Sequence, residues 1–385
     1  MSVVLVSGAR TAIGAMGGAF KDISESELAV HALKGALTRA GVQPEDLQEL
    51  TLGQVISAGR SAYNARRIAL ESGLREDVPS YQVNQLCGSG MRAAYAAFQA
   101  LKLGEHQLVT AGGAENMTQA PYILPTARYG QKLGHQTLLD TLTHTLTCGV
   151  SDLPMGITAE NIAEKYRITR QEQDGWTVIS HQRALEAQRS GRFAKEIVPV
   201  GTRSGLVDQD ERPQETTLEA ISKLRPVFKK EGTVTAANAS GINDGACMMI
   251  FATEDYARAQ GLPILARIHG FHSVGVPPEL MGLGPSLAIP RLLQRFEKTL
   301  SDIDLIEVNE AFAAQFLGVA RDLNLDLEKT NVNGGAVALG HPVGMSGARV
   351  LYTLALELQE RNLQWGVGSL CIGGGQGIAC LIERV

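Results

Sequence analysis

The segment VNQLCGSGMR at residues 83–92 decides the fold, because a second stretch of the chain repeats its features in the same order. Residues 332–349 also begin with Val-Asn, carry a histidine in place of the cysteine after a longer loop, and end on Ser-Gly-x-Arg. Upstream of each, EDLQELTLG (residues 45–53) parallels SDIDLIEVN (residues 301–309). We therefore predict a duplicated fold with pseudo-twofold symmetry and a functional site between the two halves.

Short apolar runs alternate with helical patterns through the first part of the chain. Runs of strand length lie at residues 3–6, 50–55 and 108–111, and helical patterns lie at residues 27–40 and 90–103. This alternation is typical of an α/β fold, in which helices cover the faces of a sheet.

The alternation stops near residue 119, and the following stretch is more polar and richer in helix signals. One signal is a capping box at Thr169 and Glu172, which should start a helix that ends near residue 190. We interpret this stretch as an inserted, mainly helical domain. The predicted division is residues 1–118, completed by about 243–264, for the N-terminal half, 119–242 for the insertion, and 265–385 for the C-terminal half.

The composition excludes several classes of function. The 385 residues are 44% hydrophobic and 19% charged, which is typical of a globular protein with a sizeable core. Lys and Arg number 35 against 40 Asp and Glu, a net charge of -5, so no nucleic acid partner is expected. No run approaches about 18 consecutive apolar residues, and the first residues lack the pattern of a signal peptide. We therefore expect no membrane partner and no secretion.

The five cysteines are far apart in the sequence and form no CxxC pair. Their number and spacing argue against a disulfide framework and against a structural zinc site. They favour a reducing compartment, so we expect a cytoplasmic protein. The cysteines are Cys87, Cys148, Cys247, Cys371 and Cys380.

Cys87 lies at a predicted strand-to-helix turn. A thiol at a helix N-terminus is close to unpaired N–H groups and to the positive end of the helix dipole, so its pKa is expected to fall. His341 lies in a loop of one proline and three glycines (GHPVGMSG, residues 340–347), where an imidazole can take the thiol proton. The competing interpretations are a buried core cysteine and a core histidine.

Cys371 and Asn309 each lie at the end of a predicted strand. The loop CIGGGQG (residues 371–377) fits neither a Rossmann loop nor a P-loop, and its glycines favour backbone N–H groups that face a developing oxyanion. An inert strand cysteine before a tight turn is the alternative. Asn309, in the tetrapeptide NEAF, is either a helix N-cap or an amide that anchors a water or a carbonyl.

Together these motifs resemble the thiolase family over essentially the whole chain. The cysteine motif, NEAF, the GHPxGxSG loop and the CxGGGxG loop occur in family order and at family spacing, and GGAENM, MGITAE and TVTAANASGIND match as well. The likeness is strongest to the bacterial biosynthetic type, acetyl-CoA C-acetyltransferase. The resemblance implies duplicated βαβαβαββ halves in a layered α-β-α-β-α arrangement, with an inserted, mainly helical loop domain.

The resemblance also implies a role for each catalytic residue. Cys87 would be the nucleophile that becomes S-acetylated, His341 would activate it, and Cys371 would remove or return the α-proton of the second acetyl group. Asn309 would hold a water that forms one oxyanion hole with His341, and the N–H groups of Cys87 and Gly373 would form the other. The implied reaction is the reversible Claisen condensation of two acetyl-CoA to acetoacetyl-CoA and CoA, without a metal or other cofactor.

A coenzyme A cleft is expected under the inserted domain. The basic run at residues 223–230 either attracts the CoA phosphates or is a solvated face. The segment at residues 123–140 resembles the loop by which biosynthetic thiolases assemble pairs of dimers, which implies a homotetramer. The implied contacts are Ser240 to the pantetheine, Phe228 and Ala236 along its groove, and Met155, Met281 and Phe312 around a short acyl pocket.

A few positions depart from the family pattern. Biosynthetic relatives commonly have Tyr-His where this chain has Leu153 and Pro154, and a glycine where it has Ala237. Cys148 lies in a shortened loop before the first of these, and the sequence around Arg212 matches the adenine-binding region only loosely.

Other functions compete with the biosynthetic one. A degradative 3-ketoacyl-CoA thiolase would run the same chemistry on longer chains, but Met281 and the segment at 123–140 favour short chains. Ketoacyl synthases and hydroxymethylglutaryl-CoA synthases share the fold, but Cys371 within CxGGGxG and the single GHP histidine argue against both. A non-catalytic acyl-CoA carrier would not require the four catalytic side chains that are present.

Overall fold

The computed structural model describes all 385 residues, and its central feature is one large sheet. Strands of the N-terminal half are β1 (Val3–Arg10), β2 (Gly14–Ala15), β3 (Leu50–Gly53), β4 (Ser80–Val83), β5 (Leu108–Asn116) and β10 (Asn243–Thr253). Strands of the C-terminal half are β11 (Ala266–Gly275), β12 (Leu305–Val308), β13 (Trp365–Ile372) and β14 (Gln376–Glu383). The order across the sheet is β4-β3-β5-β10-β1-β11-β14-β13-β12, with β2 beside β10.

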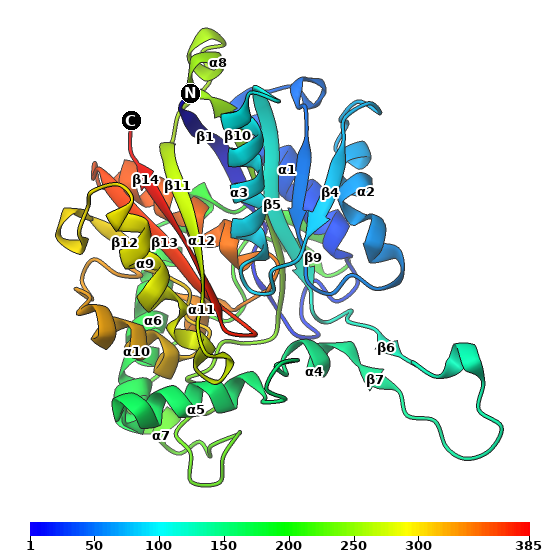
Figure 1. The fold of residues 1–385 in the computed structure, drawn as a ribbon, viewed down its shortest axis with the longest axis vertical. Helices are drawn as coiled ribbons and strands as arrows, with labels where there is room; N and C mark the ends of the chain where they lie inside the picture. The colour runs from blue at the N-terminus through cyan, green and yellow to red at the C-terminus, as the bar shows by residue number, and fades with distance from the viewer.

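The strand order is symmetric about the contact between β1 and β11. These two strands pair antiparallel through Val3–Leu5 and Ala266–Ile268, and each is flanked by the last strand of its own half. Figure 1 shows the N-terminal half, in blue and cyan, on one side of this contact and the C-terminal half, in yellow to red, on the other. The predicted duplication is confirmed by this topology.

One element of the C-terminal half is much shorter than its N-terminal counterpart. Where β4 pairs with β3 over four residues, the equivalent segment forms a single bridge between Thr330 and Ile306. The side chain of Asn331 supplies the next rung, because its Oδ1 accepts from the N–H of Val308 and its Nδ2 donates to the carbonyl of Val308, both at 2.8 Å. A side-chain amide thus replaces a stretch of strand.

Helices form three layers around the two half-sheets. The outer face of the N-terminal half is covered by α1 (Glu25–Ala40) and α2 (Asn64–Glu71). Between the half-sheets lie α3 (Ser89–Leu103) and α12 (Ser346–Glu360), which pack against each other. The other outer face is covered by α9 (Gly284–Gln294) and α10 (Ala313–Leu323). The predicted layered arrangement is confirmed. The short helices α8 (Glu254–Ala259) and α11 (Ala336–Leu339) complete the two halves.

Local sequence explains several of these boundaries. Ser24 and Glu27 form a capping box at the start of α1, and Gly41 ends the helix with a φ of 68°, which glycine adopts without steric cost. The predicted capping box of Thr169 and Glu172 is present as well, at the start of α6 (Arg170–Arg189). The helix predicted from that signal is therefore confirmed.

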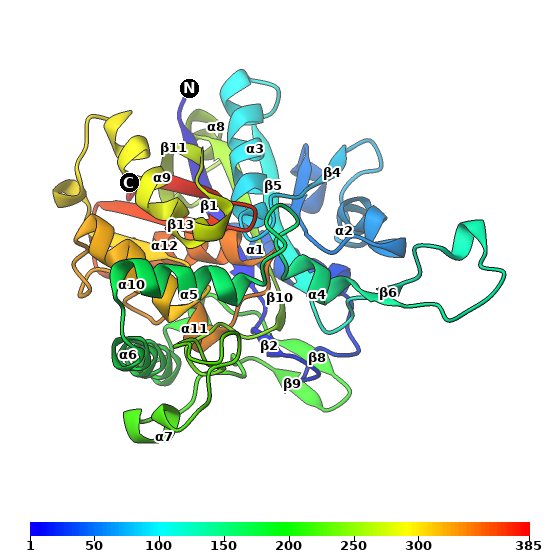
Figure 2. The same ribbon diagram turned by 60° about the horizontal axis from the view of Figure 1, so that its bottom comes forward.

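The insertion carries most of its regular structure as helices. The long segment between β6 and β7 extends away from the body in both views (Figures 1 and 2), and its Tyr129 and Leu133 are each 89% exposed. None of the chain's helices has the length and hydrophobicity needed to cross a bilayer. The remaining elements are α4 (Thr141–Thr145), α5 (Met155–Tyr166), α7 (Leu218–Ser222), and the hairpins β6 (Tyr122–Ile123) with β7 (Leu139–Asp140) and β8 (Val200–Thr202) with β9 (Gly205–Val207).

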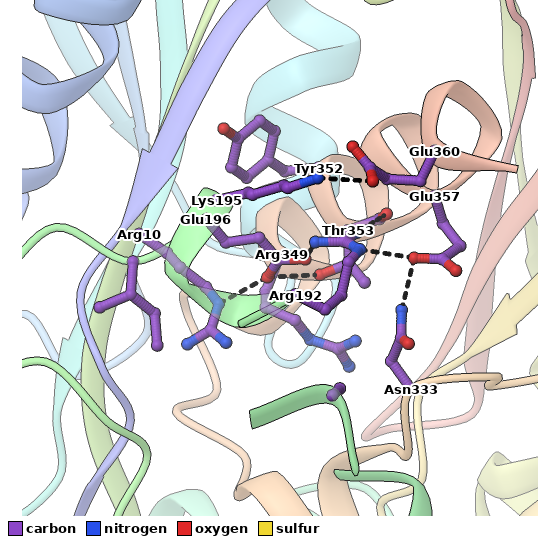
Figure 3. Close-up of polar contacts among 12 residues, drawn as sticks. Arg10, Arg192, Lys195, Glu196, Asn333, Arg349, Tyr352, Thr353, Glu357 and Glu360 are labelled. Carbon is purple, nitrogen blue, oxygen red and sulfur yellow. Dashed lines mark hydrogen bonds and ion pairs between the residues drawn. The ribbon is translucent and has the colours of Figure 1, made fainter. Parts of the chain in front are cut away.

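A buried network of charges ties the insertion to both halves (Figure 3). Arg10 of β1 donates to Glu196 at 2.7 Å and forms two hydrogen bonds with Asp210, and all three side chains are inaccessible or nearly so. Glu196 also pairs with Arg192 at 2.9 Å, and Arg192 in turn pairs with Glu357 of α12 at 2.6 Å. Although burial opposes it, the charges of Arg192 and Arg10 hold the pKa of Glu196 below its usual value.

Candidate active site

Cys87 lies in a strained turn between β4 and α3. The residue before it, Leu86, has a φ of 47°, which is uncommon for a side chain of this kind. Ser89 stabilises the turn, because its hydroxyl donates to the carbonyl of Leu86 at 2.6 Å and accepts from the N–H of Gln85 at 2.9 Å. A Cβ on Gly88 would lie 2.4 Å from Ile372, so glycine at this position lets the end of β13 pack directly on the cysteine turn.

His341 is buried in the loop between α11 and α12. Its backbone N–H donates to Asn243 Oδ1 at 3.1 Å, and its ring nitrogen Nδ1 lies 2.6 Å from the hydroxyl of Ser346. That hydroxyl donates its one proton to the carbonyl of Pro342 at 3.0 Å, so Nδ1 must donate to the hydroxyl oxygen. The other nitrogen, Nε2, is left with a lone pair.

Asn309 lies directly after β12, with its backbone N–H bonded to the carbonyl of Ser369 at 3.0 Å. Its Nδ2 lies 3.5 Å from Nε2 of His341, and its Oδ1 is buried without a hydrogen-bond partner. A buried amide oxygen without a donor is an acceptor available to a water or a ligand. It is not the N-cap of α10, because Phe312 holds that position.

Cys371 and Gly373 lie at the end of β13, next to the cysteine turn. Cys371 is fully buried and does not reach the main cavity described below. The backbone N–H groups of Gly373 and of Cys87 itself lie close enough to the Cys87 sulfur to favour its thiolate and so oppose the rise of its pKa. Two such N–H groups beside one sulfur are placed to stabilise negative charge on the oxygen of an acyl group that this sulfur carries.

A cavity of about 360 Å³ opens beside these residues and is lined mostly by apolar side chains. Cys87 and His341 both line it, one from each half of the fold. Asn309 does not line the cavity, but its side chain lies beside that of His341. All residues expected to contact coenzyme A line the same cavity: Met155, Phe228, Ala236, Ser240, Met281 and Phe312.

Burial controls the protonation of the site. It raises the pKa of the Cys87 thiol to about 11, despite the N–H groups that favour the thiolate, and it lowers the pKa of His341 to about 4. Burial also raises the pKa of Cys371 well above its usual value, and ionisation of Cys87 would raise it further. The expectation of a lowered pKa at Cys87 is therefore wrong, because desolvation outweighs the backbone N–H groups that favour the thiolate. The free site holds a neutral thiol and a neutral imidazole.

Glu115 joins the loop that follows β3 to the histidine loop. Its buried carboxyl group accepts from the N–H groups of Val55 and Ile56 in the N-terminal half and from Gly344 of the histidine loop, each at 3.0 Å. Sequence reasoning missed Glu115, although it lies within the GGAENM stretch. It also missed the hydrogen bond between Ser346 and His341. The available signal was that the two residues lie five positions apart within GHPVGMSG.

A nucleophilic thiol, a base with a free Nε2 and converging N–H groups can together form and break a thioester. Comparison with known proteins agrees with this chemistry: the family described as "Thiolase, N-terminal domain" matches residues 3–255, and "Thiolase, C-terminal domain" matches residues 262–384. The chain belongs to the thiolase family. It is an acyltransferase whose substrates are thioesters of coenzyme A.

Individual thiolases are similar to this one along their whole length. A "Probable acetyl-CoA acyltransferase" of Staphylococcus aureus (strain COL) is 47% identical over 389 residues, which cover 99% of each chain. The crystal structure of human mitochondrial 3-ketoacyl-CoA thiolase with CoA has a TM-score of 0.97 and 44% identity, covering 100% of this chain and 98% of that one. The Bacillus anthracis acetyl-CoA acetyltransferase structure has the same TM-score and identity, with 100% and 99% covered.

Proposed function

We propose that this thiolase is an acetyl-CoA C-acetyltransferase, which condenses two acetyl-CoA reversibly to acetoacetyl-CoA and CoA through an S-acetyl-Cys87 intermediate. The observation that carries the proposal is that Cys87 and His341 line one cavity whose wall includes the bulky side chains of Met155, Met281 and Phe312. A second pocket, between Cys87, Met155 and Gly373, has a volume of only about 20 Å³. That is room for about one water, so no long acyl chain fits there.

The first half of the reaction transfers an acetyl group to Cys87. Nε2 of His341 takes the thiol proton as the sulfur attacks the thioester carbonyl, because the buried thiol is protonated at neutral pH. The carbonyl oxygen becomes negative and accepts from the N–H groups of Cys87 and Gly373, each worth roughly 3–4 kcal/mol in such sites. The proton on His341 then leaves with the sulfur of CoA, and the acetyl group stays on Cys87.

The second half of the reaction needs a carbanion on the second acetyl group. Cys371 first gives its own proton to Nε2 of His341 and, as a thiolate, removes the α-proton. The enolate oxygen accepts from the new Nε2–H of His341 and from a water that the free Oδ1 of Asn309 binds. Ionisation of Cys87 would raise the pKa of Cys371 beyond the effect of burial. An acetylated Cys87 cannot ionise, so no charge on its sulfur opposes the thiolate of Cys371 in this half of the reaction. The carbanion then attacks the acetyl carbonyl, the bond to the sulfur of Cys87 breaks, and the Cys87 thiolate recovers its proton from Nε2 of His341.

A degradative 3-ketoacyl-CoA thiolase is the second candidate, favoured by the equal similarity of the human 3-ketoacyl-CoA thiolase. The test is CoA-dependent thiolysis of acetoacetyl-CoA beside its six- to ten-carbon homologues, with the Cys87→Ala variant as control. We expect a strong preference for the four-carbon substrate that is lost in the variant. Equal or faster thiolysis of the long chains would contradict the biosynthetic assignment. Leu153 and Pro154, which precede α5, would then be the positions that admit longer chains.

Further features of the protein belong to the same proposal. The enzyme works in the cytoplasm without a metal or other cofactor, and the segment at residues 123–140 assembles two dimers into a homotetramer. Exposed apolar side chains at Tyr129, Leu133 and Leu138 support this assembly. The chain divides at residues 118, 242 and 264 into the two halves and the insertion. Sedimentation that shows only dimers would contradict the tetramer.

A further inference from the structure

Glu115 carries a buried carboxyl group that the proposed reaction does not use. It lies near the end of β5, is 1% exposed, and pairs with no cation. Its partners are three backbone N–H groups, those of Val55, Ile56 and Gly344. A buried carboxyl group without a cation is costly unless hydrogen bonds offset its desolvation. These three hydrogen bonds offset that cost and tie two loops to β5.

One oxygen of Glu115, Oε2, holds the histidine loop. It accepts from the N–H of Gly344 at 3.0 Å, three residues after His341. A Cβ on Gly344 would lie 2.6 Å from this oxygen and 2.6 Å from the carbonyl oxygen of Ala114, so glycine lets the loop lie directly on β5. A displacement of this oxygen would therefore displace the segment that carries the imidazole.

The same oxygen holds the loop after β3, which leads to the nucleophile. It accepts from the N–H of Val55 at 3.0 Å. The carbonyl of Val55 accepts in turn from Nδ2 of Asn84 at 3.1 Å, and Oδ1 of Asn84 accepts from the N–H of Leu86 at 2.9 Å. Leu86 is the residue of positive φ directly before Cys87. A chain of hydrogen bonds thus runs from the histidine loop through this carboxyl group to the strained turn of Cys87.

The carboxyl group is close enough to Cys87 for its protonation to affect the thiol. An ionised Glu115 would raise the pKa of Cys87 and so oppose the thiolate. Burial, with a smaller contribution from Glu25, raises the pKa of Glu115 to about 8 despite the three N–H groups. At neutral pH the group is therefore mostly neutral, and it acts by accepting hydrogen bonds rather than by supplying charge.

We propose that Glu115 is a positioning residue, which sets the place of the His341 imidazole relative to the Cys87 thiol. The proposal rests on the thiolase function proposed above, in which Nε2 of His341 takes the thiol proton. Val55 and Val343, one from each loop, line the small pocket beside Cys87, so the two loops meet at the nucleophile. Catalysis depends steeply on such geometry, and a misplacement of about 1 Å can cost about 10²-fold in rate.

The test compares two changes of the carboxyl group. Glu115→Ala removes both acceptor oxygens, whereas Glu115→Gln keeps one oxygen for the N–H groups of Val55 and Gly344. Thiolysis of the 3-ketoacyl-CoA that the wild-type protein cleaves fastest gives kcat and KM separately, and urea unfolding gives the stability of each variant.

A control and a second background separate positioning from a merely structural role. Glu49→Ala removes another buried carboxyl group of the same half, one that contacts Thr51 and Tyr81 rather than either loop. Glu115→Ala is also combined with His341→Ala. A positioning residue acts through the imidazole, so its effect on the rate should depend on the presence of His341.

We expect Glu115→Ala to lower kcat by about 10²-fold with little change in KM, and Glu115→Gln to recover most of the rate. In the His341→Ala background, Glu115→Ala should lower the residual rate hardly further. A wild-type kcat in Glu115→Ala would overturn the proposal. An equal loss in Glu49→Ala, or an undiminished loss in the absence of His341, would overturn it as well.

Asn84→Ala breaks the same chain at an exposed side chain, so it tests the proposal even where Glu115→Ala does not fold. It should lower kcat by about tenfold, since it removes one or two hydrogen bonds, and this loss should also depend on His341. An unchanged kcat in Asn84→Ala would overturn the proposal. A wild-type protein that cleaves no 3-ketoacyl-CoA would overturn the proposed function instead.

Discussion

The hydroxyl of Ser346 lies 2.6 Å from Nδ1 of His341 and 3.0 Å from the carbonyl oxygen of Pro342. Since it donates to the carbonyl, the imidazole must carry its proton on Nδ1 and a lone pair on Nε2. That lone pair lies 3.5 Å from the donor Nδ2 of Asn309, which agrees with this tautomer. Ser89, the matching serine of the other half, stabilises the turn of Cys87 in the same way. The duplication thus supplies one serine for each catalytic loop.

Replacing Ser346 with alanine should lower kcat by about tenfold with little change in KM, because the lost hydrogen bond no longer fixes the tautomer. Ser346→Thr keeps the hydroxyl and should restore most of the rate. Steady-state thiolysis as a function of pH checks this, since loss of the preferred tautomer shifts the apparent pKa of the base. An alanine variant with the wild-type rate and pH profile would contradict the role of Ser346.

The protonation of Cys87 should be visible in its alkylation rate. Because its pKa is about 11, the thiolate fraction in the free enzyme is small at neutral pH and rises as the pH increases. The rate of iodoacetamide reaction at Cys87, followed by peptide mass spectrometry, should rise about tenfold per pH unit between neutral pH and this pKa. A rate that is flat through the neutral range would indicate a preformed thiolate beside a charged His341, contrary to this account.

Substitution of Cys371 should separate the two halves of the reaction, because only the second half depends on this thiol. Cys371→Ala should still take an acetyl group from acetyl-CoA onto Cys87, but condensation should fall by about 10²–10⁴, the usual contribution of general acid–base catalysis. Release of CoA in a single turnover and formation of acetoacetyl-CoA measure the two steps separately. Cys380→Ala, at another buried cysteine in β14, is the matched control and should keep both. Condensation at the wild-type rate in Cys371→Ala would assign the proton transfer to another group.

The buried ion network should contribute far more to the free energy of unfolding than a neighbouring exposed ion pair does (Figure 3). Glu196→Gln leaves Arg10 and Arg192 without their shared carboxylate and should lower the free energy of unfolding by about 3–5 kcal/mol. Glu360→Gln breaks the pair with Lys195, whose side chains are 39% and 54% exposed, and should cost less than about 1 kcal/mol. Urea unfolding of both variants is the measurement. Equal losses would show that the network does not hold the insertion to the two halves.

Much of the fold was predictable because local signals agree with the tertiary structure. The repeated Ser-Gly-x-Arg pattern marks the starts of α3 and α12, and the capping box at Thr169 marks the start of α6. The reduced strand at Thr330 was not predictable, because the rung is made by the side chain of Asn331 rather than by a pattern of residues. Pairing of a side-chain amide with a strand has no signature in hydrophobic periodicity.

The candidate site was predictable in its residues but not in its electrostatics. Motif spacing singled out Cys87 and His341, which the fold brings to one cavity. The raised pKa of Cys87 follows from burial by segments distant in the sequence, so the local helix N-terminus gave the wrong direction.

The central claim is that Cys87 carries the acetyl group between the two halves of the reaction. The most direct measurement is peptide mass spectrometry of the protein quenched in acid after brief incubation with acetyl-CoA alone. We predict one acetyl group per chain, located on Cys87, discharged by added CoA and absent in Cys87→Ala. An acetyl group on Cys371 or Cys148 instead, or none on any cysteine, would contradict the account.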